Sequence, residues 1–168
     1  MIVVYTGDGK GKTSAAMGQI MRAMGHGMRV ACAQFLKRGG VAGEQVVLAR
    51  MLGEDYHVGG LGFMRDQRDF QRHRDAARVT LKWAADRLAE QVQVLVLDEL
   101  LYTLGAGLIE QEEVQSLLDA ARSRNVHLVL TGRGLPGWLR DQADLVTELV
   151  VQKHPYNQGQ AALRGIDF

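Results

Sequence analysis

The sequence predicts an α/β protein with a mainly parallel sheet of about six strands and helices on both faces. Short apolar, β-rich runs alternate along the chain with segments of helical periodicity, which is the order of β-α-β units. The run at 92–97 is almost wholly apolar, as expected for a central strand covered on both faces. The chain has 168 residues without a visible linker or internal repeat, so we expect a single domain over residues 1–168.

The first half of the chain predicts two strand–helix units and a short third strand. Residues 2–5 are apolar and β-branched or aromatic, which is typical of a strand. Residues 13–25 are rich in Ala and Met and run into Gly25-His26-Gly27, which predicts a helix that stops at glycine. A strand, a helix and a short strand are expected next, at 29–35, 43–52 and 56–58.

The second half continues the alternation. The longest helix is predicted at 69–88, because five apolar residues fall on one of its faces: Phe70, Ala77, Leu81, Ala84 and Leu88. After the strand at 92–97, we expect a helix, a strand, a short helix and a strand at 110–123, 126–130, 135–142 and 145–151. Because ligands of such sheets bind at the carboxyl ends of the strands, the loops that follow strands are the candidate site.

Composition excludes several classes of function. Hydrophobic residues make up 46% and charged residues 23% of the chain, and the net charge of +1 gives no large field for nucleic acid or membrane. Cys32 is the only cysteine, so an internal disulfide and a cysteine zinc cluster are excluded, and we expect a buried, inert thiol. Neither a signal peptide nor a membrane span is visible, and we expect a cytoplasmic protein.

A glycine-rich loop joins the first strand to the first helix. Its glycines allow the backbone to wrap around an anion, Lys12 adds a positive charge, and the Thr13 hydroxyl can bind magnesium. The dipole of the helix that follows also favours an anion. We therefore expect a nucleoside triphosphate, held by nine residues: Thr6, Gly7, Asp8, Gly9, Lys10, Gly11, Lys12, Thr13 and Ser14.

The spacing of this loop departs from the usual pattern. Glycine, four residues and Gly-Lys-Thr would place the first glycine at position 6, where the chain has Thr6, and the glycines crowd at positions 7, 9 and 11. A dinucleotide-binding fingerprint does not fit either, because Lys12 fills its last glycine position. The alternative is a glycine-rich turn that only joins a strand to a helix.

Two carboxylates follow the predicted central strand directly. Asp98 and Glu99 match the acid that holds magnesium, or its water shell, beside a phosphate-binding loop. The alternative is a solvated strand end. The sequence leaves open which of the two carboxylates faces the metal.

Cations follow two other strands. Arg133, in Thr131-Gly132-Arg133-Gly134, could reach phosphate oxygens and offset developing negative charge, or it could be incidental to a surface turn. Lys37 ends the second strand shortly before Gly43-Glu44, and the alternative is a loop in which Lys37 and Arg38 are solvated.

A flexible glycine loop at 59–63 carries a single aromatic residue, Phe63. This loop could be a lid over a hydrophobic substrate, or Phe63 could be tucked into the core. The basic segment 65–82 is interleaved with acids, which favours a solvated helix face over a nucleic-acid stripe. Segments 153–156 and 165–168 are expected near the sheet edge, without a role that their chemistry defines.

The ordered series of motifs resembles the P-loop ATP:corrinoid adenosyltransferases over essentially the full chain. The series comprises 4–13, Arg22-Ala23 with Gly25-His26-Gly27, Gln34-Phe35-Leu36-Lys37, Gly43-Glu44, Gly62-Phe63, Leu97-Asp98-Glu99-Leu100, Thr131-Gly132-Arg133, 143–148, Lys153-His154 and Gly165-Ile166-Asp167. The resemblance implies a three-layer, RecA-like P-loop fold. It also implies transfer of the 5′-deoxyadenosyl group of ATP to Co(I) of a corrinoid (cobalamin, cobinamide or cobyrinic acid diamide). Triphosphate is released, and the product serves adenosylcobalamin biosynthesis or salvage.

The resemblance also implies roles for individual residues. ATP lies reversed relative to kinases, so Lys12, helped by Arg133, acts on the departing triphosphate, with Mg²⁺ (or Mn²⁺) at Thr13, Asp98 and Glu99. Phe63 faces the lower side of the corrinoid, which eases reduction to Co(I). Arg65 stands where some members have a second aromatic residue, so a different corrinoid preference is one implication.

Partners follow from the same resemblance. We expect a homodimer, a flavodoxin-like or other electron donor, a corrinoid partner, and neither nucleic acid nor membrane. The chain opens directly on the first strand, so we expect no lid from the N-terminal extension that longer members carry.

Two other functions use the same loop. A P-loop phosphotransferase or NTPase would cleave the γ-phosphate instead, and a regulator would bind ATP or a corrinoid without turnover.

Overall fold

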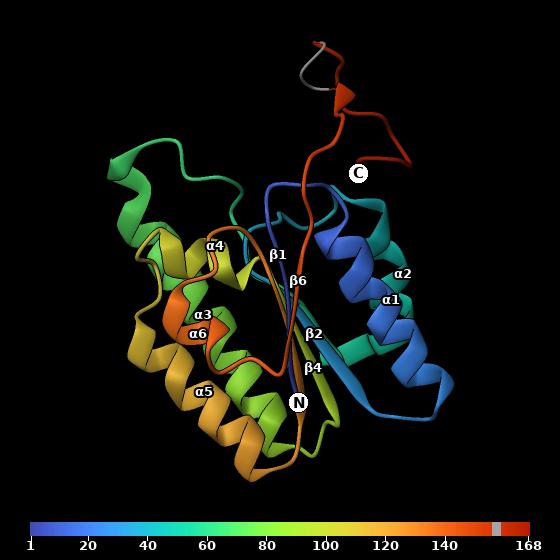
Figure 1. Cartoon of the computed structure of the whole chain (residues 1–168), viewed down its shortest axis with the longest axis vertical. Helices are drawn as coiled ribbons and strands as arrows, with labels where there is room; N and C mark the ends of the chain where they lie inside the picture. Colours follow the sequence, from blue (N-terminus) through green and yellow to red (C-terminus); the bar gives the residue numbers. More distant parts are fainter. Residues whose placement is uncertain (156–158) are drawn as a thin grey trace.

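The structure, a computed structural model, describes residues 1–155 and 159–168, and within these residues six strands form one sheet (Figure 1). The strand order is β3-β2-β4-β5-β1-β6, and every neighbouring pair is parallel. The strands are β1 (Ile2–Thr6), β2 (Val30–Gln34), β3 (Tyr56–Val58), β4 (Val94–Asp98), β5 (His127–Thr131) and β6 (Leu145–Glu148). Each parallel crossover needs a helix, as the alternating sequence pattern predicts.

Helices cover both faces of the sheet, which gives three layers (Figure 1). On one face lie α1 (Lys12–Gly25) and α2 (Gly43–Leu52). The other face carries α3 (Phe70–Ala89), α4 (Leu100–Gly105), α5 (Gln111–Ser123) and α6 (Gly137–Arg140). The predicted α/β fold with helices on both faces is therefore confirmed.

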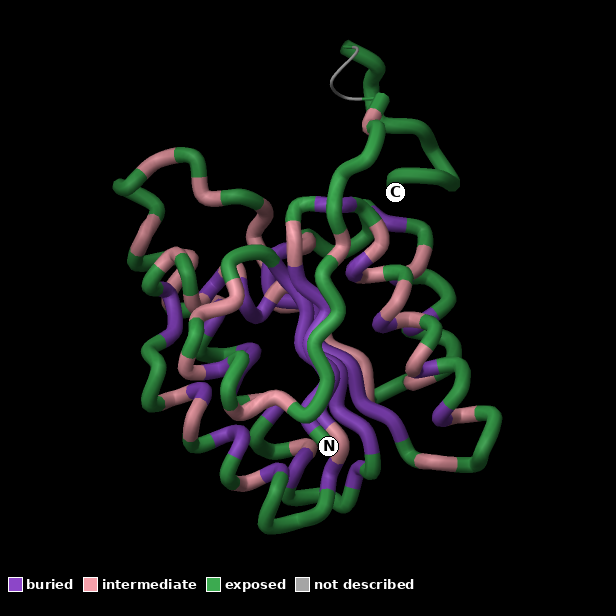
Figure 2. The backbone as a smooth tube through the Cα atoms, viewed as in Figure 1, coloured by how far each residue is buried: buried purple, intermediate pink, exposed green. Residues whose placement is uncertain are grey.

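Alternation along each strand sends side chains into two separate cores. In β4, Val94 and Val96 pack under α1 and α2, whereas Leu95 and Leu97 face the helices of the opposite layer. The strands inside the sheet are buried along most of their length, whereas the edge strand β6 is exposed (Figure 2). The prediction of a central, doubly covered strand is confirmed, and Cys32 is buried as expected.

Several element boundaries differ from the sequence prediction. The strand predicted at 145–151 ends at Glu148, because Leu149 leaves the sheet to contact the glycine loop. The helix predicted at 135–142 is only Gly137–Arg140, since Pro136 stands before its first residue. Helix α4 was not predicted at all: it starts after Glu99, whose left-handed φ of 63° turns the chain sharply. The strand predicted at 92–97 starts at Val94 in the structure and ends at Asp98.

The strand order explains why distant segments meet. Strand β5 lies between β1 and β4, so the loop after β1 and the acid that ends β4 are separated by one strand. On the other side of β4, Gln34 of β2 is in register with Asp98. The carboxyl ends of all these strands lie at one edge of the sheet, which is where ligands of parallel sheets bind. Within the described residues, we find no helix with the length and apolar character that crossing a bilayer requires.

Candidate functional site

The glycine loop after β1 packs against the chain that follows β6. The Gly9 amide donates to the Leu149 carbonyl at 2.7 Å, and the Leu149 amide donates to the Thr6 carbonyl at 2.8 Å. A Cβ on Gly7 would lie 2.4 Å from the Leu149 oxygen, and one on Gly9 would lie 2.7 Å from it. Gly7 and Gly9 are therefore required by this backbone approach, and Thr6 belongs to β1, where it pairs with Glu148.

Lys12 is folded back onto its own loop. Its ammonium donates to the carbonyl oxygens of Gly7 and Gly9, each at 2.7 Å, and the residue is only 7% exposed. Burial lowers the pKa of Lys12, although the negative charge of Glu99 opposes this shift. The charge is thus satisfied inside the loop, at the place where phosphate oxygens would compete for it.

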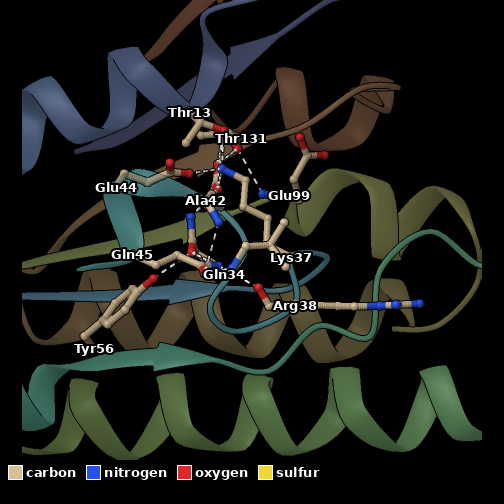
Figure 3. A network of polar contacts seen from close by, with 12 residues as sticks. Thr13, Gln34, Lys37, Arg38, Ala42, Glu44, Gln45, Tyr56, Glu99 and Thr131 are labelled. Carbon is tan, nitrogen blue, oxygen red and sulfur yellow. Dashed lines mark hydrogen bonds and ion pairs between the residues drawn. The ribbon is translucent and has the colours of Figure 1, made fainter. Parts of the chain in front are cut away.

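Asp98 is buried and accepts hydrogen bonds from a network of polar side chains, of which Figure 3 labels Thr13, Gln34 and Thr131. The hydroxyls of Thr13 and Thr131 donate to its Oδ1 atom at 3.0 Å and 2.7 Å. The side-chain amide of Gln34 donates to Oδ2 at 3.1 Å. The fully buried carboxylate is therefore oriented from three elements, namely α1, β5 and β2.

Two further residues fix Gln34 in place (Figure 3). Its carbonyl Oε1 accepts hydrogen bonds from the Tyr56 hydroxyl at 2.7 Å and from Gln45 Nε2 at 3.2 Å. Burial raises the pKa of Tyr56, so its hydroxyl keeps the proton that it donates. With its oxygen occupied, Gln34 can present only its amide hydrogens to Asp98. The sequence does not predict that Gln45 and Tyr56 contact Gln34, because a single polar residue in a helix or strand does not indicate its partner.

Lys37 places an ammonium among three oxygen groups. Its Nζ atom lies 2.5 Å from Glu44 Oε1 and 3.4 Å from both Asp98 Oδ2 and the Thr13 hydroxyl. Burial alone would lower the pKa of Lys37, but Asp98 and Glu44 outweigh it and the pKa is raised. The side chains of Lys37 and Glu44 are each 26% exposed, so the solvated-loop alternative is wrong for Lys37, whereas Arg38 is exposed as that alternative expected.

Glu99 lies beside Asp98 but in a different environment. Its backbone amide donates to Thr131 Oγ1 at 2.9 Å, and its side chain is half-buried. Burial, followed by repulsion from Asp98, raises the pKa of Glu99. Of the two predicted carboxylates, Asp98 therefore contacts Thr13, whereas Glu99 faces the cavities described next.

A cavity of about 410 Å³ opens over the start of α1. Residues 10–14 of the loop form one wall, and Lys37, Glu44 and Glu99 contribute to the others. The predicted nucleotide residues thus divide into two groups: Lys10, Gly11, Lys12, Thr13 and Ser14 line the cavity, whereas Thr6, Gly7, Asp8 and Gly9 do not.

The last residues of the chain complete this cavity. Lys10 donates to the Ile166 carbonyl at 2.7 Å and forms an ion pair with Asp167, and residues 165–168 line the cavity. The chemistry of residues 165–168 defines no role from the sequence alone, and the structure places these residues at the wall of this cavity. In the other C-terminal segment, Tyr156 lies outside the described residues.

Arg133 stands at the rim of the loop. Its Nε atom lies 3.6 Å from the Asp8 carboxylate, and both side chains are largely exposed. Arg133 does not line the 410 Å³ cavity, although its charge contributes to the lowered pKa of Lys12. Arg133 lies near the loop because it follows β5, the strand beside β1.

Phe63 is 67% exposed, so the alternative that it is tucked into the core is wrong. Its ring meets the edge of Tyr102 at 5.7 Å between centroids, with an angle of 86° between the planes. Tyr102 lies on α4, the helix that was not predicted; the apolar spacing of Leu100, Leu101 and Leu104 was its only signal.

A second, mostly apolar cavity of about 290 Å³ connects Phe63 with the nucleotide side. It shares Lys37, Glu99, Asp167 and Phe168 with the 410 Å³ cavity. Arg65 lies apart from both and lines a third cavity, which also reaches Phe63. The structure thus brings the phosphate-binding loop and the exposed aromatic ring to two ends of one continuous surface.

The sequence profile of one protein family, described as ATP:corrinoid adenosyltransferase BtuR/CobO/CobP, matches residues 1–168. The chain belongs to this family. A corrinoid adenosyltransferase from Pseudomonas aeruginosa is 39% identical over 170 residues, which cover 100% of this chain and 83% of that protein. The corrinoid adenosyltransferase CobA of Salmonella typhimurium is 38% identical over 174 residues, covering 100% of this chain and 85% of the relative.

Two solved structures resemble this family member in fold. A KaiC-like protein from Pyrococcus horikoshii matches with a TM-score of 0.51 at 15% identity, over 91% of this chain and 74% of that chain. The DNA-packaging ATPase of Sulfolobus turreted icosahedral virus also matches with a TM-score of 0.51, at 18% identity, over 94% of this chain and 79% of that chain. These likenesses concern the fold alone, and they confirm the RecA-like P-loop architecture.

Proposed function

We propose that this member of the family transfers the 5′-deoxyadenosyl group of ATP to Co(I) of a corrinoid and releases triphosphate. The observation that carries this assignment is the shared wall between the nucleotide cavity and the apolar cavity that ends at Phe63. A phosphate cradle alone would fit many enzymes. A phosphate cradle that opens toward an exposed aromatic ring fits a reaction between a nucleotide and a large planar partner.

The chemistry matches the residues present. Reduced cobalt is itself the nucleophile, so the protein does not have to activate a serine, a cysteine or water. Its tasks are to align C5′ of the ribose with the cobalt and to stabilise the charge of the departing triphosphate. Lys12 and the loop amides serve the second task, and Arg133 at the rim assists if it swings away from Asp8.

The oxygen donors at the loop fit a small, hard cation such as Mg²⁺, with Mn²⁺ as an alternative. The Lys37 ammonium already lies among the Thr13 hydroxyl, Asp98 and Glu44, which shows that this position favours positive charge. Among the described residues, no cluster of three or more His, Cys, Asp or Glu side chains could hold a metal. We therefore propose that the ion is held jointly by Thr13, Asp98 or Glu99 and by phosphate oxygens, and that it neutralises triphosphate charge.

Phe63 is proposed to lie against the lower face of the corrinoid. Its exposure leaves the ring free to displace a lower cobalt ligand. The T-shaped contact with Tyr102 restricts the orientation of the Phe63 ring. Arg65, in the place of a second aromatic residue, would meet the corrinoid at its periphery. Four further expectations stay predictions: a flavodoxin-like or other electron donor, a homodimer, a cytoplasmic location and a single domain over 1–168.

An anaerobic assay tests the proposal. ATP and chemically reduced corrinoid are mixed with the protein, and the alkyl–cobalt absorption spectrum and the phosphate product are followed together. Alkyl–cobalt with one triphosphate per turnover supports the proposal. Release of ADP and phosphate would instead indicate an NTPase, and ATP binding without turnover would indicate a regulator; either result overturns it.

A further inference from the structure

Phe63 also lines a third cavity, of about 600 Å³, which has a basic wall. Arg38, Arg65 and Arg72 line it together with His73, and Asp69 is its one acidic residue. Arg38 follows β2, and Arg65 lies in the segment between β3 and α3 that also carries Phe63. Arg72 lies in the first turn of α3. Three separate segments thus bring guanidinium groups to one concavity.

Among the described residues, ten lysines and arginines form ion pairs with carboxylates, whereas Arg38, Arg65 and Arg72 form none. Next to them, Arg68 pairs with Asp66 at 2.6 Å, and Arg74 pairs with Glu110 at 2.7 Å. Within residues 1–155 and 159–168, by contrast, no ion pair or side-chain hydrogen bond involves Arg65 or Arg72. Their charge is therefore available to a ligand.

Arg38 is held in position by the loop that carries Phe63. Its Nε atom donates to the Leu61 carbonyl at 2.6 Å, and the side chain packs so closely on Gly62 that a Cβ there would lie 2.8 Å from Nε. Gly62 has a φ of 89°, which favours glycine for a second reason. The terminal nitrogens of Arg38 have no partner among the described residues, so this guanidinium is fixed at its inner end and open at its outer end.

Phe63 lines this basic cavity and the apolar cavity that leads to the nucleotide. A macrocycle that lies against the Phe63 ring, as proposed above, would extend its edge over the arginines. Corrinoids carry side chains around that edge, either as neutral amides or as free carboxylates, and some carry a phosphodiester in a nucleotide tail. Guanidinium groups bind oxyanions by paired, charge-assisted hydrogen bonds that an amide cannot match.

We propose that Arg38, Arg65 and Arg72 bind oxyanions on the corrinoid periphery, so that the chain favours corrinoids bearing carboxylate or phosphate over fully amidated ones. This inference rests on the proposed function and names the class of its second substrate. It also gives Arg65 a reason to replace an aromatic residue.

The test compares three corrinoids: one with only amide side chains and no nucleotide tail, one with amides and a phosphodiester tail, and one with free carboxylates. A hydrogen bond to a charged group corresponds to about 10–100-fold in affinity, so kcat/KM for at least one oxyanion-bearing corrinoid should exceed that of the amide compound by this factor. The arm that shows the advantage identifies the source of the oxyanion. Raising the salt concentration should reduce the kcat/KM advantage of that corrinoid, because salt screens the charges.

The variant Arg65→Gln/Arg72→Gln should collapse the ratio between the corrinoids toward one, mainly through KM for the anionic compound. Arg50→Gln, which changes an exposed arginine on α2, is the matched control and should leave the ratio unchanged. Binding of Co(II) corrinoid without ATP, followed by fluorescence quenching, gives the same comparison without turnover. Equal use of all three corrinoids, or a ratio that the double variant does not change, overturns this inference alone. Absence of alkyl–cobalt from every corrinoid overturns the proposed function instead.

Discussion

The Thr13 hydroxyl donates a hydrogen bond of 3.0 Å to Asp98, which ties the first turn of α1 to the last residue of β4. The two halves of the phosphate site are thus connected to each other directly. Thr131 and Gln34 hold the same carboxylate from its two neighbouring strands. The site is preorganised by the order of strands in the sheet, which keeps the cost of aligning these groups on binding small.

Replacing Asp98 should separate the roles of the two adjacent carboxylates. Asp98→Asn removes the charge that faces Thr13, and loss of such a metal partner typically weakens metal affinity by roughly 10–100-fold. The measurement is the rise in Tm that ATP produces at increasing Mg²⁺ concentration, which corrects for any lower baseline stability. Glu99→Gln is the matched comparison and should change this rise less. A larger loss in Glu99→Gln would assign the metal to Glu99.

Lys12→Ala should reduce adenosylation by about 10²–10³-fold, the usual effect of removing one group that stabilises developing charge. The ammonium now held by the Gly7 and Gly9 carbonyls would no longer be available to triphosphate. Initial rates with chemically reduced corrinoid measure the effect, with Lys82→Ala on the exposed side of α3 as control. Undiminished rates would refute the assignment of the loop.

Gly9→Ala and Gly18→Ala should shift stability in opposite directions. A methyl group on Gly9 would lie 2.7 Å from the Leu149 backbone and must push the chain that follows β6 away from the loop, so both stability and ATP binding should fall. Gly18 lies on the exposed side of α1 with open space around it, and alanine there should stabilise the fold by about 1 kcal/mol. Denaturant unfolding with and without ATP checks both. A neutral Gly9→Ala would show that the Leu149 contact is dispensable.

Phe63→Ala should reduce activity more in assays that start from Co(II) corrinoid than in assays that start from chemically reduced Co(I). The expected difference arises because the ring is proposed to favour the reduction rather than the transfer. Tyr102→Phe keeps the ring that contacts Phe63 and serves as control. Equal losses in the two assays would count against the lower-face role.

His57 should make the fold sensitive to mild acid. Burial lowers its pKa, and its ring stacks on Trp83 with centroids 5.3 Å apart. Because the unfolded chain binds the proton more readily, this contribution is complete above the unfolded pKa of about 6.5 and declines as pH falls toward the folded pKa. His57→Phe, which keeps the stacking, should flatten the free energy of unfolding over that range. His26→Gln, at an exposed histidine, should retain the slope.

The sequence predicted those features that local patterns encode. Strand and helix order, the glycine loop, the acid after the central strand and the family all follow from runs of residues that are contiguous in the chain. Contacts set by the strand order could not be predicted, because Thr131, Gln34 and Leu149 reach the site only once β5, β2 and β6 are placed. The packing of 165–168 on Lys10 is likewise a contact over more than 150 residues, with no local signal.

The position of Phe168 has a practical consequence for anyone who handles this protein. Phe168 lines both the nucleotide cavity and the apolar cavity, whereas the amino group of Met1 lies exposed beside His127 at the opposite end of the sheet (Figure 1). An affinity tag fused after Phe168 would therefore begin at the mouth of the nucleotide cavity and compete there with ATP. Tags, dyes and immobilisation chemistry belong at residue 1, some way from where the substrates meet.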